Sequence, residues 1–134
     1  MAFDQFALQQ AIYQRLTAQI TDVPTFSNVP AKQAYPYIRL DMIAADDDGT
    51  KTADLWECEV QISAFFDDLS GTGPVSALLK RIAAALIDAQ AALAMTGQAC
   101  VFIRLKMQTI LQPGGPDERY VHGVQRFLLL IQEL

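Results

Sequence analysis

Residues 54–66 alternate between apolar and polar side chains, and this pattern constrains the fold more than any other in the chain. The apolar members stand at even positions: Trp56, Cys58, Val60, Ile62, Ala64 and Phe66. Because successive side chains of a β-strand point to opposite faces, the pattern predicts a strand with one buried face. The other face of this strand meets water or a partner.

An amphipathic helix is predicted directly after this strand. The segment DDLSGTG, residues 67–73, has the composition of a turn, and Pro74 stands where the first turn of a helix tolerates proline. Apolar residues then recur at three- and four-residue spacing: Val75, Leu78, Leu79, Ile82, Ala83, Leu86 and Ile87. They form one stripe, which can lie across the buried face of the sheet.

The rest of the chain contains further elements that complete or cover this sheet. Residues 4–20 predict a second amphipathic helix, which begins near Asp4. Three more stretches have strand-like patterns: 35–44, 99–111 and 118–132. The last two are joined by the proline- and glycine-rich segment QPGGPD.

Two connecting segments are less regular. Residues 21–34 contain prolines and leave room for at most a short strand around 26–29, and the alanine-rich residues 89–96 are expected to extend the long helix until Gly97 ends it. The sequence therefore predicts an α+β fold, a mostly antiparallel sheet of about four strands with two helices packed on one face. We expect a single domain over residues 1–134, since no long linker divides the chain.

The composition favours a folded protein that does not bind nucleic acid directly. Hydrophobic residues make up 51% of the chain, charged residues make up 19%, and the net charge is −5. Nucleic-acid-binding domains usually carry an excess of Lys and Arg that neutralises phosphates. No apolar run approaches the roughly 18 residues of a membrane span, and the N-terminus MAFDQFALQQ lacks the basic start of a secretory signal. We therefore expect no membrane segment and no export signal.

Few residues have the pattern of a catalytic site. His122, the one histidine, lies in a predicted strand. Cys58 and Cys100 also lie on predicted strands, and we expect two buried free thiols rather than a disulfide. A small enzyme that uses Cys58 or Cys100 with His122 is nevertheless the alternative from a different functional class.

Ligand-binding patterns are equally incomplete. The acidic run at residues 46–48 lacks the alternating ligand positions and the distal glutamate of a calcium loop. Gly71 and Gly73 lack the following lysine of a phosphate-binding loop. We therefore expect no catalytic residue, no cofactor and no metal.

Several charged residues lie on the predicted strands and can share the face that the helices leave open. They are Arg39, Asp41, Glu57, Glu59, Arg104, Lys106, Arg119 and Arg126. One interpretation is cross-strand ion pairs within the chain, each worth about a few tenths of a kcal/mol. The other is a charge-patterned surface on which identical copies dock.

The last predicted strand is apolar on both faces from Phe127 to Ile131. Such a stretch needs cover on both sides. Either a helix covers each side there, or one face is buried against another subunit.

Four segments, taken in order, resemble a known family: ALQQAIYQRL at 7–16, YPYIRL at 35–40, LLKRIAAAL at 78–86 and YVHGVQRFLL at 120–129. With these segments the chain resembles the tail-completion, or tail terminator, proteins of long-tailed bacteriophages and of related gene transfer agents. The resemblance covers nearly the whole chain. None of the four segments is a catalytic signature.

This resemblance implies a structural virion protein and not an enzyme. Such proteins form a ring, typically of six copies, that caps the tail tube, stops its polymerisation and offers a docking surface to the head connector. The implied partners are other copies of the chain, the tail tube protein and the head connector or neck protein. The implied location is the tail–neck junction, after assembly in the host cytoplasm. DNA would pass through the ring without specific binding, and no membrane takes part. A neck or head-closure component is the alternative within the particle.

The resemblance also suggests roles for particular segments. Two segments would project toward the lumen, the tube or the neck. They are the acidic loop 45–52, with Asp46, Asp47, Asp48 and Lys51, and the tip 112–118, with Pro113, Gly114, Gly115 and Pro116. An acidic lumen would repel the phosphates of passing DNA. The expected subunit contacts are Arg39, Asp41, Glu57, Glu59, Arg104, Lys106, Arg119, Phe127 and Leu129.

Overall fold

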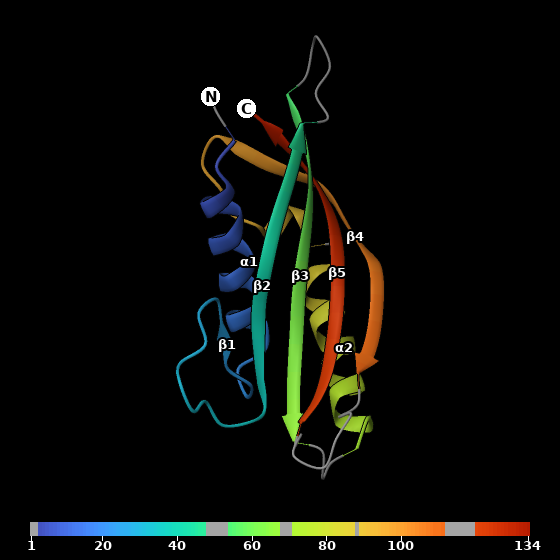
Figure 1. The fold of residues 1–134 in the computed structure, drawn as a ribbon. Coiled ribbons are helices and arrows are strands. Elements are labelled where there is room, and N and C mark those ends of the chain that lie inside the picture. Colours follow the sequence, from blue (N-terminus) through green and yellow to red (C-terminus); the bar gives the residue numbers. More distant parts are fainter. Residues whose placement is uncertain (1–2, 48–53, 68–70, 88, 112–119) are drawn as a thin grey trace.

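The computed structural model describes residues 3–47, 54–67, 71–87, 89–111 and 120–134 of the chain (Figure 1). Its elements are α1 (Gln5–Gln19), β1 (Thr25–Phe26), β2 (Tyr37–Asp47), β3 (Leu55–Asp67), α2 (Gly73–Leu86), the 3-10 turn η2 (Gln90–Ala92), β4 (Gln98–Leu111) and β5 (Tyr120–Glu133). The two predicted helices and the four predicted long strands are all present. The ends of α1 and of the four long strands differ from the expected ones by up to three residues.

The strands form one sheet in the order β1-β2-β3-β5-β4. Three neighbouring pairs are antiparallel, β2 with β3, β3 with β5 and β5 with β4, whereas β1 joins β2 in parallel. The described sheet therefore has five strands and is mixed, which corrects the prediction of about four. The additional strand, β1, is only two residues long. A pair of residues is too short to show alternation, so the sequence could not place it firmly.

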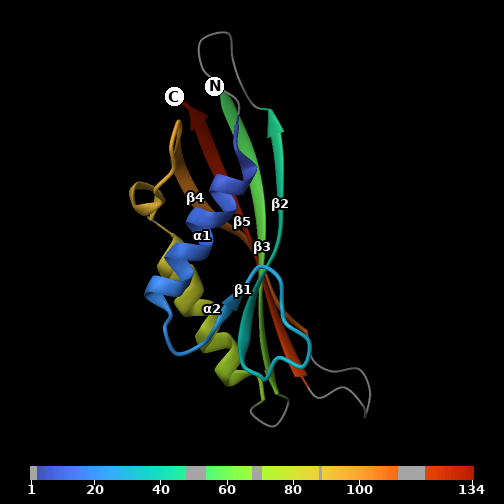
Figure 2. The same cartoon turned by 90° about the vertical axis from the view of Figure 1, so that its left-hand side faces the viewer.

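Both helices lie on the same side of the sheet, as predicted, and no described element covers the other side, which is called the bare face below (Figures 1 and 2). The covered face and the inward sides of the helices form one hydrophobic core. Its fully buried large side chains are Phe127, Leu8, Ile12, Leu16, Ile38, Ile62, Leu78, Leu79, Ile82, Leu86, Leu129 and Ile131. The alternation in β3 is confirmed, because Cys58, Val60, Ile62 and Ala64 are all buried in this core.

Both helices begin where the sequence predicts. Asp4 caps α1, and its Oδ1 accepts a hydrogen bond from the Ala7 N–H at 3.0 Å. This bond satisfies one of the backbone donors that a helix leaves unpaired at its start. Pro74 lies in the first turn of α2, where its missing N–H costs no helical hydrogen bond.

The end of α2 differs from the prediction. The Ile87 N–H still bonds the Ala83 carbonyl at 2.8 Å, but Ile87 then leaves the helical conformation with φ −65° and ψ 133°. Ala89 and Leu93 are buried, so the chain turns back onto the core through η2 instead of continuing as a helix. The expected extension over residues 89–96 is therefore wrong, because burial of these two side chains outweighs the helix propensity of alanine.

Two buried glutamines tie the layers together. The Gln98 side chain at the start of β4 accepts from the Asp4 N–H at 2.9 Å and donates to the Asp4 carbonyl at 3.0 Å. The Gln125 amide on β5 donates to the Leu79 carbonyl at 2.8 Å and to Gln108 Oε1 at 2.7 Å. These bonds connect β4 to the start of α1 and β5 to α2. They compensate the burial of the Gln98 amide and of Gln125 Nε2, whereas Gln125 Oε1 is buried without a hydrogen-bond partner among the described residues.

Candidate assembly surfaces

The face of the sheet that no helix covers carries most of the charged residues singled out by the sequence. Asp41 on β2 is the most enclosed of them, with its side chain only 10% exposed. Its carboxylate accepts hydrogen bonds from Arg39 Nε, from Ser63 Oγ and, at 3.0 Å, from Gln61 Nε2. Asp41 therefore holds β2 to β3 through side chains as well as through the backbone.

A second cross-strand network surrounds Glu59 on β3. Its carboxylate lies 3.4 Å from Lys106 Nζ on β4 and 3.6 Å from Arg126 Nη1 on β5. Arg126 Nε also donates to Gln61 Oε1 at 3.0 Å. The cross-strand interpretation is thus confirmed for these residues, and a role of the same groups in docking stays a prediction.

Glu57 and Arg104 lie on the same bare face and are exposed. The guanidinium of Arg104 lies 5.7 Å from the centre of the Phe102 ring on its own strand. Arg104 lies on β4, the long strand at one edge of the described sheet, and its side chain is exposed to solvent.

The last strand is covered by helices on one side only. Phe127, Leu129 and Ile131 point into the core, while Leu128 and Leu130 lie on the bare face. Leu128 is buried there among the side chains of the sheet itself. The structure therefore corrects the assignment of Phe127 and Leu129 to a subunit contact, because the side chains at odd positions of β5 pack beneath the helices of their own chain.

The acidic segment begins on a strand rather than in a loop. Asp46 and Asp47 are the exposed last residues of β2, which runs further than the sequence predicts. The other residues of the two expected projections lie outside the described residues. They are Asp48, Lys51, Pro113, Gly114, Gly115 and Pro116, together with Arg119.

An aromatic cluster occupies the end of the bare face where β3 ends. The Phe65 ring stacks on Tyr37 with centroids 4.9 Å apart and on His122 with centroids 4.3 Å apart. Tyr120 also contacts Phe65, at 5.9 Å, and the Arg39 guanidinium lies 4.9 Å from the Phe65 centroid. The sequence analysis missed this cluster, although Tyr37 and Phe65 already fall on the polar face of their strands.

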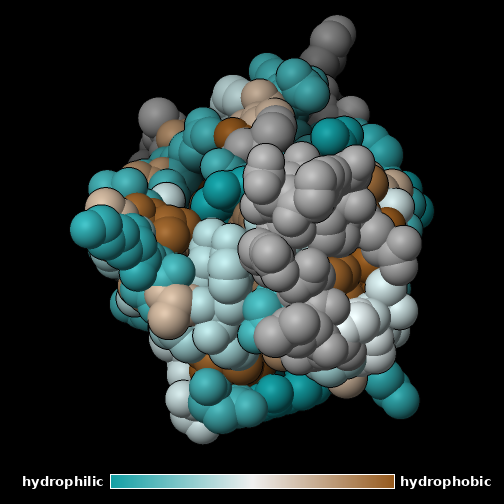
Figure 3. Space-filling view, turned by 60° about the horizontal axis from the view of Figure 1, so that its bottom comes forward, coloured by the Kyte–Doolittle hydropathy of each residue, from teal (hydrophilic) through white to brown (hydrophobic). Residues whose placement is uncertain are grey.

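At this end of the molecule, hydrophobic side chains reach the surface in separate patches among hydrophilic ones, as the coloured residues of Figure 3 show. Phe65 is buried in this cluster, whereas Tyr37, Tyr120 and His122 are partly exposed. Burial lowers the pKa of His122 below its ordinary value of 6.5, because the charged imidazolium is poorly solvated there. Its Nε2 is buried without a hydrogen-bond partner among the described residues.

Both thiols are free, as predicted. Cys58 is buried as expected, whereas Cys100 is only partly buried. Burial raises the pKa of both Cys58 and Cys100 to about 12, so neither is a ready nucleophile at neutral pH. Cys58 pairs with Leu129 of β5, seven residues from His122, which is roughly 23 Å along the strand. Cys58 also faces the core, whereas His122 faces the bare side. The geometry does not bring a cysteine and the histidine into one site.

Metal binding and membrane insertion find no support in the part of the chain that the structure describes. No group of three His, Cys, Asp or Glu side chains gathers there in a way that could hold a metal ion. None of the helices described has the length and apolarity needed to cross a membrane.

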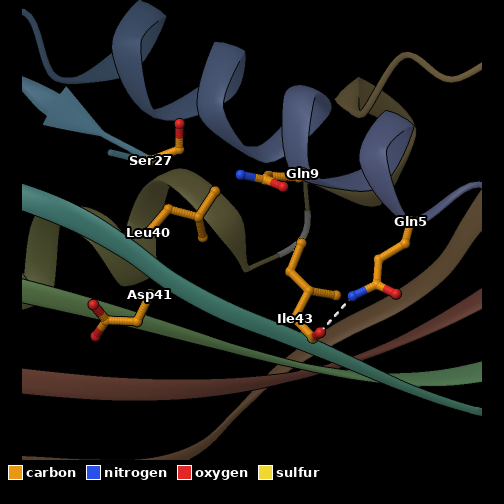
Figure 4. Close-up of a pocket in the computed structure, with 6 residues that line it drawn as sticks. All are labelled: Gln5, Gln9, Ser27, Leu40, Asp41 and Ile43. Atoms are coloured by element: carbon orange, nitrogen blue, oxygen red, sulfur yellow. Dashed lines mark hydrogen bonds between the residues drawn. The ribbon is translucent and has the colours of Figure 1, made fainter. Parts of the chain in front are cut away.

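A hollow of about 260 Å³ lies between α1 and the outer edge of β2 (Figure 4). Its lining residues are Gln5, Gln9, Ser27, Leu40, Asp41 and Ile43. Gln5 Nε2 donates to the Ile43 carbonyl at 2.5 Å, and the Asp41 carboxylate points away from α1. Two glutamine amides and the Ser27 hydroxyl are thus among the polar groups that line this hollow.

Two solved structures resemble this chain in fold. A chain in the solved structure titled "Virion of native gene transfer agent (GTA) particle" superimposes with a TM-score of 0.78 at 20% identity, over 95% of this chain and 96% of that chain. A second solved chain, 18% identical, superimposes with a TM-score of 0.55 over 99% of this chain and 98% of that chain. These likenesses show a shared fold. No curated protein matches the sequence.

The family comparison covers nearly the whole chain. The model of the family described as "Tail completion protein gp17" matches residues 10–132. This span begins within α1 and ends within β5. The chain therefore belongs to the tail completion protein gp17 family.

Proposed function

We propose that this protein is a tail terminator, a closed ring of identical copies that caps the tail tube. In this role it stops tube polymerisation and presents the surface to which the head connector or neck protein binds. The observation that carries the proposal is the tail completion family match over residues 10–132. A tail is completed only when its growing end accepts no further tube subunit, and a ring bound to that end has this effect.

The fold comparison supports a place in the tail of a particle. A chain of similar fold belongs to a gene transfer agent virion, and the likeness covers 95% of this chain. The proposed location is the tail–neck junction, reached after assembly in the host cytoplasm. Six copies are proposed for the ring, as the resemblance implies.

The chemistry of the described residues favours a structural role over a catalytic one. Both thiols have a pKa of about 12. The histidine and the cysteines lie on opposite faces of the sheet. An enzyme needs groups of matched acidity within hydrogen-bond reach of one another, and the described residues do not place such groups together.

Passage of DNA through the ring is compatible with the charge of the chain. The net charge is −5, and Asp46 and Asp47 are exposed at the end of β2. Asp48 and Lys51 follow directly in the sequence. We propose that this acidic end lines or approaches the lumen, where repeated carboxylates repel phosphates and keep DNA from binding. The tip at residues 112–118 is proposed to contact the tube or the neck.

Tube length is the quantity that tests the proposed function. Tail tube protein is polymerised with and without this protein, and electron microscopy records the lengths and the ends of the tubes. We expect a ring at one end of each tube and an arrest of growth. Unchanged growth with no end density would overturn the proposal. Binding to isolated heads, without any effect on tubes, would support a neck or head-closure role instead.

A further inference from the structure

The β4 strand leaves one long edge of the sheet unpaired. Among the described residues β4 pairs only with β5, and no other element lies beyond it (Figure 1). Its register with β5 shifts between Cys100 and Phe102 and again between Leu105 and Met107. Only Phe102–Leu105 is regular between these shifts. Irregularities of this kind limit where a second strand can pair with an edge.

The β2 strand leaves a second edge unpaired, on the opposite side of the sheet. The short β1 pairs only with Ile38 and Arg39, so beyond these residues β3 is the one neighbour of β2 within the part of the chain that the structure describes. The Ile43 carbonyl receives the Gln5 side chain and therefore points away from β3. Since backbone direction alternates along a strand, the N–H and C=O of Ala45 also point outward. A carbonyl oxygen has two lone pairs, so that of Ile43 can accept a second bond.

The directions of the strands allow these two edges to pair in the favourable sense. β2 is antiparallel to β3, β3 to β5 and β5 to β4. β2 and β4 consequently run in opposite directions within one chain. When copies are related by rotation about an axis along the strands, β4 of one copy meets β2 of the next as an antiparallel neighbour.

Cyclic symmetry also relates the heights of the two edges. Ala44 pairs with Glu59, Glu59 with Leu128, and Leu128 with Arg104, so Ala44 and Arg104 stand at the same level of the sheet. A closed ring has no rise along its axis. With strands along that axis, Arg104 of the neighbouring copy is therefore opposite Ala44 and diagonal to Asp46. The regular stretches Ile43–Asp47 and Phe102–Leu105 meet at this level.

The charges of the two edges are complementary. The exposed Asp46 lies near the end of β2, whereas β4 carries the exposed Arg104 and Lys106. Pairing of like edges, β2 with β2 or β4 with β4, would set acids against acids or bases against bases. Like charges directly opposite each other destabilise a sheet, so the unlike edges are favoured.

Exposed apolar side chains flank both edges. On the β2 side, Phe6 and Tyr13 of α1 are 63% and 38% exposed and border the same Gln9 and Ser27 that line the hollow. On the β4 side, Val101 is 46% exposed. Contact between the two sides would remove these groups from water.

We propose that β2 of one copy pairs antiparallel with β4 of the next copy, so that the sheets of neighbouring subunits join into one wall. The occupant of each free edge is thus a second copy of this chain, held by backbone hydrogen bonds and by attraction between Asp46 and Arg104. Such a head-to-tail contact closes into a ring when the rotation between copies closes. The closed form of this contact rests on the proposed ring function, which it deepens by naming the surfaces.

Disulfide trapping tests the pairing directly. The double variant Ala44→Cys with Arg104→Cys is oxidised in solution and with tail tubes present, then separated under non-reducing conditions. We expect a ladder of covalent oligomers, because directly opposite residues approach to a distance that a disulfide can bridge. Each single variant should stop at dimers. The matched control, Ala44→Cys with Lys80→Cys on the exposed side of α2, should give no ladder, and the wild type measures the background of the native thiols.

Charge exchange tests the electrostatic part of the pairing. We expect Asp46→Arg or Arg104→Glu alone to weaken self-association by roughly fivefold or more, and the combined variant to restore it to within about twofold. Light scattering measures the association, and circular dichroism checks the fold. Failure of the combined variant to recover would count against the Asp46–Arg104 contact.

The outcomes separate this inference from the proposed function. Rings that cap tubes but give no ladder would overturn the edge pairing and leave the terminator role standing. A ladder from a protein that does not affect tubes would overturn the terminator role and support the edge pairing. The edge pairing would also be overturned if the wild-type protein stayed monomeric, both free and with tubes, and the double cysteine variant gave no ladder.

Discussion

Gly123 on β5 lies directly beneath Leu79 of α2. A Cβ atom placed at Gly123 would stand 2.9 Å from Leu79 Cδ1 and 2.9 Å from Val75 Cγ2, closer than such atoms can approach. The absence of a side chain at this one position allows α2 to pack closely on the sheet.

Substitution Gly123→Ala should therefore destabilise the protein. Leu79 and Val75 are both fully buried, so neither can move aside without disturbing the core. We expect a loss of roughly 1–3 kcal/mol in the free energy of unfolding, measured by urea denaturation. Gly73→Ala is the matched control, since nothing lies within 4 Å of a Cβ there, and its change should stay below about 0.5 kcal/mol. Equal effects of the two substitutions would contradict this account.

Removal of the Gln98 side chain should loosen the start of α1. Gln98→Ala deletes both of its hydrogen bonds to the Asp4 backbone in a buried place. We expect a loss of about 1–3 kcal/mol in stability and faster amide exchange in the first turn of α1. Gln10→Ala, on the exposed side of the same helix, serves as the control. Unchanged exchange in Gln98→Ala would show that the tie contributes little.

The stability of the protein should depend on the protonation of His122. Burial holds the pKa of folded His122 below its ordinary 6.5, so below that pH the unfolded chain binds the proton more strongly than the folded chain. The contribution of neutral His122 is complete above pH 6.5 and is lost as the pH falls below 6.5 toward the folded pKa. The variant His122→Phe should lose this component. Melting temperatures of the two proteins, compared at a series of pH values, measure the difference, and parallel curves would contradict the prediction.

Both cysteines should be slow to alkylate in the folded protein. A pKa of about 12 leaves on the order of one thiol in ten thousand ionised at pH 8. We expect reaction with a thiol reagent to take hours in buffer and to become fast in denaturant. Cys58→Ser and Cys100→Ser variants assign each reaction. A rapid reaction of one thiol in the native state would revive the cysteine-dependent enzyme alternative.

Neutralising the acidic end of β2 should affect DNA passage and not the fold. The substitution of Asp46, Asp47 and Asp48 by asparagine removes charge with little change of shape. We expect unchanged unfolding curves and slower delivery of DNA by the particles, compared at equal numbers of assembled rings because loss of the Asp46 charge also weakens its proposed contact with Arg104. Lys80→Gln, on α2, is a control for a change of surface charge elsewhere. Normal DNA delivery by the triple variant would show that this charge has no such role.

The spacing of apolar residues in the sequence predicted the main elements, because the residues that face the core of a helix or strand recur at a regular spacing. The even positions of β3 from Cys58 to Ala64 are buried, and Asp4 and Pro74 mark the starts of the helices as expected. The two-residue β1 and the turn at residues 89–96 were not predictable in this way. Their conformations depend on contacts with β2 and with the core, which lie far away along the chain.

For the candidate surfaces too, the sequence predicted some features and only the structure showed others. Alternation placed Arg39, Asp41 and Glu59 on the bare face. It could not show that Asp41, which pairs with Arg39, also bonds to Ser63 and Gln61. Nor could it show that Glu59 pairs with Lys106 and Arg126. Nor could it tell that Phe127 and Leu129 point beneath the helices while Leu128 does not. Strand register decides both, and register arises from pairing between distant segments.

By itself the sequence determined the elements, the α+β class and the family resemblance, because these follow from local patterns of apolar and polar residues. Only the tertiary structure decided the strand order, and with it the two unpaired edges at β2 and β4. The physical reason is that an edge is defined by the absence of a neighbouring strand, and neighbours in a sheet are set by packing of the whole chain rather than by local sequence.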